Sequence, residues 1–156
     1  MNGRIDRRLQ ELRIELPNPI SPVANYVPTA FLNNALFISG QICRWNNERR
    51  YVGKVGADIS VDDARQAARL CGLNLLAQAK QALNGDLDRV VRVVRLLGFV
   101  NALPDFRDHP KVIDGASDLM VEVFGESGRH ARAAVGAGSL PGLSAVEMEA
   151  VFEVRE

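Results

Sequence analysis

The sequence predicts an α+β fold in which two long helices pack on one face of a mixed β-sheet. Two segments, 60–84 and 108–125, show the apolar period and the end signals of amphipathic helices. Strand-like segments give the order helix, hairpin, helix, strand, helix, strand, strand. The chain has 156 residues, of which 47% are hydrophobic, and we expect residues 1–156 to form a single domain with its own core.

A short amphipathic helix is predicted at the N-terminus. Apolar residues recur there at helical spacing, with charged residues between them: Ile5, Leu9, Leu12 and Leu16. Pro17 cannot continue a helix, so a helical extension over residues 1–16 is expected, followed by a proline-spaced linker.

A β-hairpin is predicted after the linker, with strands over residues 26–33 and 35–39. Asn33 and Asn34 lie between the strands and tolerate the positive φ angle that a tight hairpin needs. Gly40 marks the end of the second strand.

The pattern between this hairpin and the first long helix is irregular. The Asn46-Asn47 pair predicts a turn, and residues 50–54 predict a short strand. The run Arg44–Arg50 mixes arginines with a tryptophan but also holds a glutamate. A solvated loop, or a lid over a cleft, is therefore favoured over a nucleic-acid patch.

The two long helices have recognisable boundaries. Ser60 predicts the N-cap of the first helix, with an aspartate three residues later, and Gly85 predicts its end. The second helix begins near Asp108, with a proline in its first turn, and closes at Gly125. Gly115 inside it disfavours a helix by about 1 kcal/mol relative to alanine, which indicates close backbone packing.

Three further strands are predicted. Residues 89–100 are β-branched and apolar for longer than one face requires, which predicts a central strand covered on both sides. Residues 130–137 predict another strand, and residues 145–154 alternate strictly. One face of that last strand carries Val146, Met148, Ala150, Phe152 and Val154, and the other carries Glu147, Glu149, Val151 and Glu153.

Charge and cysteine content limit the classes of function. Nineteen basic and nineteen acidic residues cancel, which disfavours binding to nucleic acid or to an anionic membrane surface. No run of about 18 apolar residues and no secretory signal pattern is present, so a cytoplasmic location is expected. Cys43 and Cys71 form no CxxC motif, and His109 and His130 are the two histidines, so no zinc site with recognisable ligand spacing is expected. Both cysteines are interpreted as small buried hydrophobes.

Two charged residues near the C-terminus need an explanation. Arg132 and Glu147 lie in apolar segments, and burying either is costly unless it is paired or faces a ligand. The structural alternatives are a pair between Arg132 and a neighbouring glutamate, and a solvated or intersubunit role for Glu147. His130 lies two residues before Arg132, hence on the same strand face. It either donates to a substrate or pairs with an acid, and the pairing with an acid is favoured.

Three segments carry a resemblance: YVPTAFLNNALFISGQI, VVRVVRLLGFVNALPDF, and HARAAVG followed by LP and VEMEA. Over about residues 22–154 the chain resembles the YjgF/RidA family, the reactive intermediate deaminases, some of which were first named L-PSP endoribonucleases. Its most specific feature is an arginine, a Leu-Pro pair eight and nine positions later, and then V-E-x-E-A. These residues are Arg132, Leu140, Pro141, Val146, Glu147, Glu149 and Ala150.

The resemblance implies a chorismate-mutase-like α+β fold assembled as a homotrimer, with three clefts between neighbouring subunits and no metal or organic cofactor. In the family, the arginine matching Arg132 binds the substrate carboxylate, and the glutamate matching Glu147 lies near the attacking water. The tyrosine matching Tyr26 and the backbone around Gly40 line the cleft.

The chain departs from the family pattern in three places. The Gly-Pro pair that precedes the tyrosine in the family is Ala24-Asn25 here. Ala134 stands where a cysteine is frequent. If this position serves the substrate through its backbone groups alone, an alanine can replace the cysteine; if the thiol contributes, this protein lacks that contribution. Ser117 stands where better-characterised deaminases carry asparagine, with helix packing as its structural alternative. Tyr26 is likewise either a cleft residue or an ordinary strand residue with a satisfied hydroxyl.

The implied function is hydrolysis of reactive enamines or imines to 2-keto acids and ammonia. Two alternatives remain open. One is a non-catalytic trimer that binds a small carboxylate metabolite, and it needs Arg132 but not Glu147. The other is RNA cleavage or translation inhibition, which neutral charge, two histidines and the missing metal motif disfavour.

Overall fold

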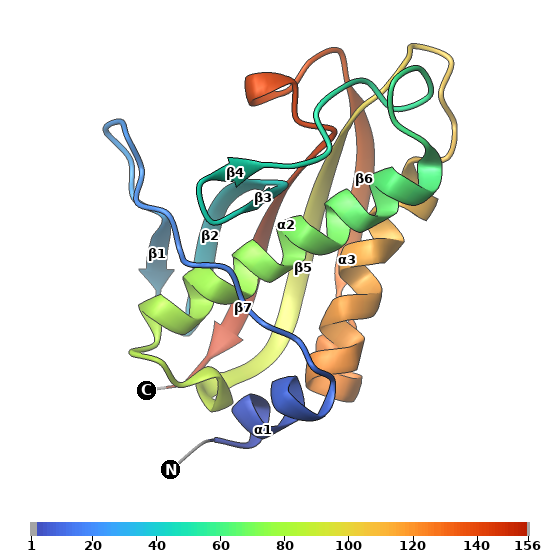
Figure 1. The fold of residues 1–156 in the computed structure, drawn as a ribbon. Helices are drawn as coiled ribbons and strands as arrows, with labels where there is room; N and C mark the ends of the chain where they lie inside the picture. Colours follow the sequence, from blue (N-terminus) through green and yellow to red (C-terminus); the bar gives the residue numbers. More distant parts are fainter. Residues whose placement is uncertain (1–2, 156) are drawn as a thin grey trace.

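The computed structural model of the chain describes residues 3–155 and shows one five-stranded sheet with two long helices on one face (Figure 1). The helices are α1 (Arg4–Glu11), α2 (Val61–Ala82) and α3 (His109–Phe124), with 3-10 turns at Leu87–Arg89, Gly125–Gly128 and Pro141–Leu143. The strands are β1 (Thr29–Leu32), β2 (Ala35–Ile42), β3 (Arg44–Trp45), β4 (Glu48–Arg49), β5 (Val90–Asn101), β6 (Ala131–Ala137) and β7 (Val146–Val154). None of the helices in residues 3–155 is long and apolar enough to cross a membrane.

The main sheet has the strand order β1-β2-β7-β5-β6 and confirms the predicted α+β class. Its neighbouring strands are antiparallel except β5 and β6, which are parallel and are joined by a connection containing α3. The strand predicted over 89–100 is an interior strand, as expected, because β5 pairs with β7 on one side and with the edge strand β6 on the other. The middle position of the sheet belongs to the C-terminal strand β7.

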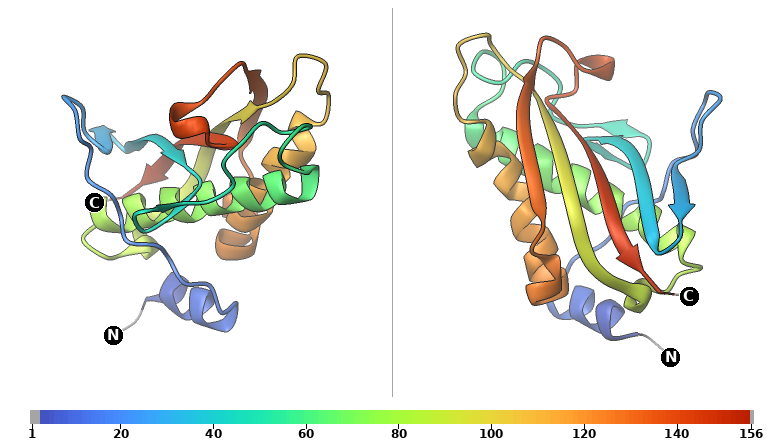
Figure 2. Two further views of the ribbon diagram at one scale, coloured as in Figure 1. Left: turned by 45° about the horizontal axis from the view of Figure 1, so that its top comes forward. Right: turned by 180° about the vertical axis from the view of Figure 1, so that it is seen from behind.

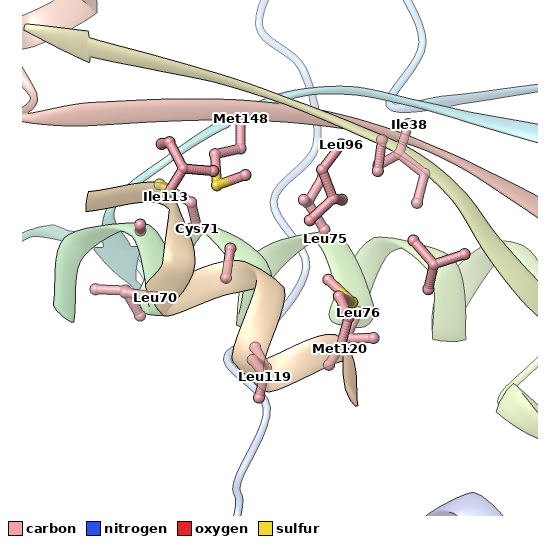
Figure 3. Close-up of a cluster of buried hydrophobic side chains, with 14 of the residues drawn as sticks. Ile38, Leu70, Cys71, Leu75, Leu76, Leu96, Ile113, Leu119, Met120 and Met148 are labelled. Carbon is pink, nitrogen blue, oxygen red and sulfur yellow. The ribbon is translucent and has the colours of Figure 1, made fainter. Parts of the chain in front are cut away.

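Helices α2 and α3 pack closely on each other and on the sheet. A Cβ atom at Gly115 would collide with the carbonyl oxygen of Arg65 on α2, so the predicted close approach at this glycine is confirmed. Their apolar faces meet the inward side chains of β2, β5 and β7 in the core that Figure 3 shows. Cys43 and Cys71 are both fully buried, as predicted.

The ends of α2 and α3 follow the predicted signals. The Ser60 side chain accepts a hydrogen bond from the backbone N–H of Asp63 at 3.0 Å and caps α2. Helix α3 follows Asp108 and ends at Gly125, whose φ angle of 63° favours glycine.

Three predicted boundaries and one predicted strand are corrected. Helix α1 ends at Glu11 rather than near Leu16, because Arg13 adopts a φ angle of 54° and turns the chain. Strand β1 begins at Thr29 rather than Tyr26. Strand β2 does not end at Gly40 but continues through a bulge to Ile42. The strand predicted over 50–54 is absent from the described chain, since Tyr51 has a φ angle of 55°, and two short strands instead flank the Asn46-Asn47 turn.

The face of the sheet opposite the helices is open within the chain (Figure 2, right). We predicted that both faces of the strand over 89–100 are covered, but within the described chain only the face of β5 toward the helices is covered. Large apolar side chains on the sheet stay partly exposed: Phe37, Val91, Val94 and Val135. Exposed apolar side chains on an uncovered sheet face are typical of an interaction surface.

Candidate functional site

A cavity of about 280 Å³ lies beside the bulged part of β2 and the start of β7. Tyr26, Gly40 and Glu147 all line it, together with the proline-spaced linker and two arginines, Arg44 and Arg49. The structure thus brings together three of the six site residues named from the sequence. Tyr26 precedes β1 and is more than half exposed, so its ring stands at the open side of the protein.

Gly40 is required by the position of Glu147. A Cβ atom at Gly40 would collide with Oε1 of the glutamate. Pairing of β2 with β7 shifts register between Ile38 and Gln41, so this glycine lies in an irregular stretch of the strand. Any other residue at position 40 would have to displace the carboxylate.

Glu147 is half-buried on β7, on the side facing away from the helices. Burial raises the pKa of its carboxyl group, and the negative charge of Glu149 adds to the effect. Arg44 and Arg49 share its cavity, but neither lies within ion-pair distance of it. Glu147 therefore lines the cavity with a carboxyl group whose pKa is raised and which makes no salt bridge among the described residues.

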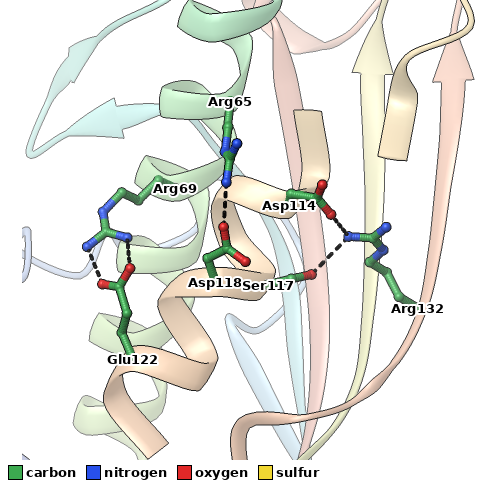
Figure 4. A network of polar contacts seen from close by, with 7 residues as sticks. All are labelled: Arg65, Arg69, Asp114, Ser117, Asp118, Glu122 and Arg132. Carbon is green, nitrogen blue, oxygen red and sulfur yellow. Dashed lines mark hydrogen bonds and ion pairs between the residues drawn. The ribbon is translucent and has the colours of Figure 1, made fainter. Parts of the chain in front are cut away.

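Arg132 belongs to a second cluster, on the other side of the sheet. Its Nη1 donates to Oδ1 of Asp114 at 2.7 Å and to Oγ of Ser117 at 3.1 Å, both on α3 (Figure 4). Within residues 3–155, neither Nη2 nor Nε of this arginine makes a hydrogen bond. The guanidinium is fixed at one nitrogen and keeps the edge that could bind a carboxylate at two points.

Ser117 and His130 extend this cluster. The Nδ1 of His130 lies 2.6 Å from the carbonyl oxygen of Gly128, which can only accept, so Nδ1 carries the proton. Nε2 then accepts from the Ser117 hydroxyl at 2.9 Å. Burial lowers the pKa of His130, and the charge of Arg132 lowers it further. The expected acidic partner of His130 is therefore corrected to a serine and a backbone carbonyl.

Arg132 and Glu147 do not neutralise each other in the chain. Arg132 is the ladder partner of Leu96, which is fully buried under the helices, and it contacts α3, so it lies on the helix side. Glu147 alternates with buried Val146 and Met148 and points the other way. The sequence-predicted site residues thus form two groups on opposite faces of one sheet.

The remaining predicted position is Ala134, two residues after Arg132 on β6. It is partly buried and packs against the core. Sequence reasoning missed Asp114, although its spacing of three from Ser117 on a helix places both on one face. It also left Arg44 and Arg49 in a solvated loop or lid. No group of three or more potential metal ligands occurs in the described part of the chain.

Comparisons with known proteins agree with this architecture. Residues 6–152 match a family model described as "YjgF/chorismate_mutase-like, putative endoribonuclease". Protein TCP17 of Trypanosoma cruzi is 44% identical over 154 residues, covering 98% of this chain and 96% of the relative. The crystal structure of Atu1372 from Agrobacterium tumefaciens has a TM-score of 0.90 at 47% identity, covering 97% of this chain and 94% of that one.

A third comparison is a structure from Shewanella oneidensis MR-1 whose name is "putative endoribonuclease". It has a TM-score of 0.93 at 36% identity, covering 97% of this chain and all of that one. The mixed sheet with two helices on one face defines a chorismate-mutase-like α+β protein. The chain belongs to the YjgF family.

Proposed function

We propose that this protein hydrolyses reactive enamines and imines of amino acids to 2-keto acids and ammonia. The observation that carries the proposal is the geometry of Arg132. Its Nη1 is held by Asp114 and Ser117, while the Nη2 and Nε edge stays available to a carboxylate. A planar guanidinium held in this way can grip both oxygens of a substrate carboxylate at once.

Glu147 supplies the second element of the proposed chemistry. A general base works best when its pKa lies near the working pH, and burial moves the pKa of Glu147 in that direction. An enamine first gains a proton from solvent at its β-carbon and becomes an iminium. The Glu147 carboxylate then takes a proton from a water while the water oxygen attacks the iminium carbon, and a carbinolamine forms. Glu147 then returns the proton to the nitrogen, ammonia leaves, and the carbinol hydroxyl loses its proton to give the 2-keto acid.

The proposed cleft lies between neighbouring subunits of a homotrimer. Within one chain Arg132 and Glu147 lie on opposite faces of the sheet, so a single chain cannot present both to one small substrate. The open apolar face of the sheet supports an assembly in which a neighbouring copy supplies the missing half of the site. The substrate is then oriented by one subunit and attacked by water bound to another.

A coupled assay tests the proposal. Threonine dehydratase or an amino-acid oxidase generates the imine, and the appearance of the 2-keto acid is followed with and without this protein. The proposal is supported if the protein accelerates conversion of the imine to the 2-keto acid and if Arg132→Ala abolishes that acceleration. Retained binding of a 2-keto acid with no acceleration would identify a non-catalytic carboxylate binder. Cleavage of RNA in the presence of a chelator, abolished by the same substitution, would instead favour the endoribonuclease activity named for its relatives.

A further inference from the structure

The cavity lined by Glu147 is also lined by two arginines that have no acidic partner among the described residues. In residues 3–155, neither Arg44 nor Arg49 makes an ion pair with an acidic side chain. Arg50, from the same run, pairs with Glu48 at 3.4 Å and stands over the Trp45 ring, 5.7 Å from its centre. The two unpaired arginines are the ones that line the cavity.

Arg44 carries a buried donor without a partner. Its Nε is the one buried side-chain nitrogen or oxygen in the described chain that makes no hydrogen bond. Native proteins rarely keep such a group unless a ligand or a water completes it. The backbone at this position is fixed, because Nδ2 of Asn74 on α2 donates to the Arg44 carbonyl at 2.7 Å. Arg44 therefore lines the cavity from a fixed stretch of backbone.

Arg49 is placed at the cavity by a glycine. A Cβ atom at Gly142 would collide with the guanidinium of Arg49, so the glycine keeps room for the cation. Gly142 has a φ angle of 61° and follows Pro141, which also lines the cavity. Two cations thus face a cavity whose single acidic wall residue is Glu147.

We propose that this cavity binds a second anionic group of the substrate through Arg44 and Arg49. The substrate class would then be 2-imino and 2-enamino acids with an acidic side chain. The inference rests on the proposed function, in which Arg132 takes the first carboxylate. Guanidinium groups bind carboxylates and phosphates with charge-assisted hydrogen bonds, and in the described residues neither of these two arginines has an acidic partner.

Calorimetric titration of the full chain compares a monoanionic probe, 2-oxobutyrate, with a dianionic one, 2-oxoglutarate. Wild-type protein is expected to bind 2-oxoglutarate about tenfold or more tightly than 2-oxobutyrate. Arg44→Gln and Arg49→Gln should each remove most of that difference and leave 2-oxobutyrate affinity unchanged. Arg50→Gln is the matched control and should keep the difference, because Arg50 is already paired with Glu48.

Equal affinity of the two probes for wild-type protein, or a difference that survives both substitutions, overturns the inference. Inorganic phosphate is a third probe, which distinguishes a carboxylate site from a phosphate site. Tighter binding of phosphate than of 2-oxoglutarate would overturn the assignment to a carboxylate. Because Arg49 is exposed, Arg49→Gln is expected to fold even if Arg44→Gln does not.

The imine assay on wild-type protein separates this inference from the proposed function. Hydrolysis of neutral and acidic imines at equal rates removes the inference and leaves the proposed function. A dianion preference that Arg44→Gln abolishes, without any imine hydrolysis, removes the proposed function and leaves an anion-binding cavity.

Discussion

Asp114 on α3 holds Arg132 on β6 through one contact, 2.7 Å between Oδ1 and Nη1. The two side chains are 41% and 24% exposed, so solvent screens their attraction. Exposed ion pairs of this kind contribute about 0–1 kcal/mol to folding. The pair therefore orients Arg132 more than it stabilises the protein.

The first prediction concerns Arg132, whose pair with Asp114 contributes little to stability. Arg132→Ala should lower the free energy of unfolding by no more than about 1 kcal/mol, yet weaken binding of a 2-keto acid by about 2–5 kcal/mol. Arg132→Lys should also lose much of the binding, because an ammonium lacks the planar fork. Urea unfolding and calorimetric titration of the same variants check both values. A destabilised protein with unchanged affinity would end the interpretation of Arg132 as a ligand residue.

The second prediction concerns Gly40. Gly40→Ala places a methyl group against Oε1 of Glu147, so the carboxylate must move. We expect imine hydrolysis to fall at least about tenfold, since catalytic groups tolerate little displacement. Gly138→Ala is the matched control, because no atom lies within 4 Å of its added Cβ. Wild-type rates in Gly40→Ala would show that the position of Glu147 does not matter for the reaction.

A third prediction uses the raised pKa of Glu147. The folded state binds a proton here more tightly than the unfolded state, so this group lowers stability as pH rises from its unfolded pKa through its folded pKa. Glu147→Gln should therefore stabilise the protein at pH 7 relative to wild type and change little near pH 3. Urea unfolding at the two pH values measures the difference. A variant less stable than wild type at pH 7 would contradict this account.

A fourth prediction separates two neighbouring acids. Glu147 and Glu149 share one face of β7, but only Glu147 lines the cavity. Glu147→Gln should slow imine hydrolysis by about 10² or more, the usual contribution of a general base, and Glu149→Gln should slow it little. Steady-state rates of both variants provide the measurement. Equal effects would mean that neither carboxylate has the proposed role.

The last prediction concerns assembly. We expect a homotrimer built on the open face of the sheet, where Val94 and Val135 are partly exposed. Val135→Glu should dissociate it while the circular dichroism spectrum stays unchanged, because the substituted side chain lies outside the chain's own core. Sedimentation at micromolar concentration gives the mass. A stable wild-type monomer would refute both the trimer and the shared cleft.

Local sequence signals determined much of the fold. Three of these signals depend on only a few neighbouring residues and can therefore be recognised in the sequence. They are the N-cap at Ser60, the glycine that ends α3 at Gly125 and the alternation of apolar and polar residues along β7. Gly115 also allowed a prediction, because a glycine inside a helix lowers its stability and so indicates close packing against a neighbouring backbone. The predictions from sequence were wrong where a residue other than glycine adopts a positive φ angle, as at Arg13 and Tyr51. The residue types at these positions do not favour such an angle, so the sequence gives no local signal for it.

For the site, the sequence by itself determined the residue types and a motif spacing that named Arg132 and Glu147. Only the tertiary structure decided which face of the sheet each occupies and what surrounds it. The pairing of Arg132 with Asp114, the fit of Gly40 against Glu147 and the presence of Arg44 in the same cavity join residues distant in sequence. Such contacts depend on strand order and register, which are set by the packing of the whole sheet rather than by any local pattern.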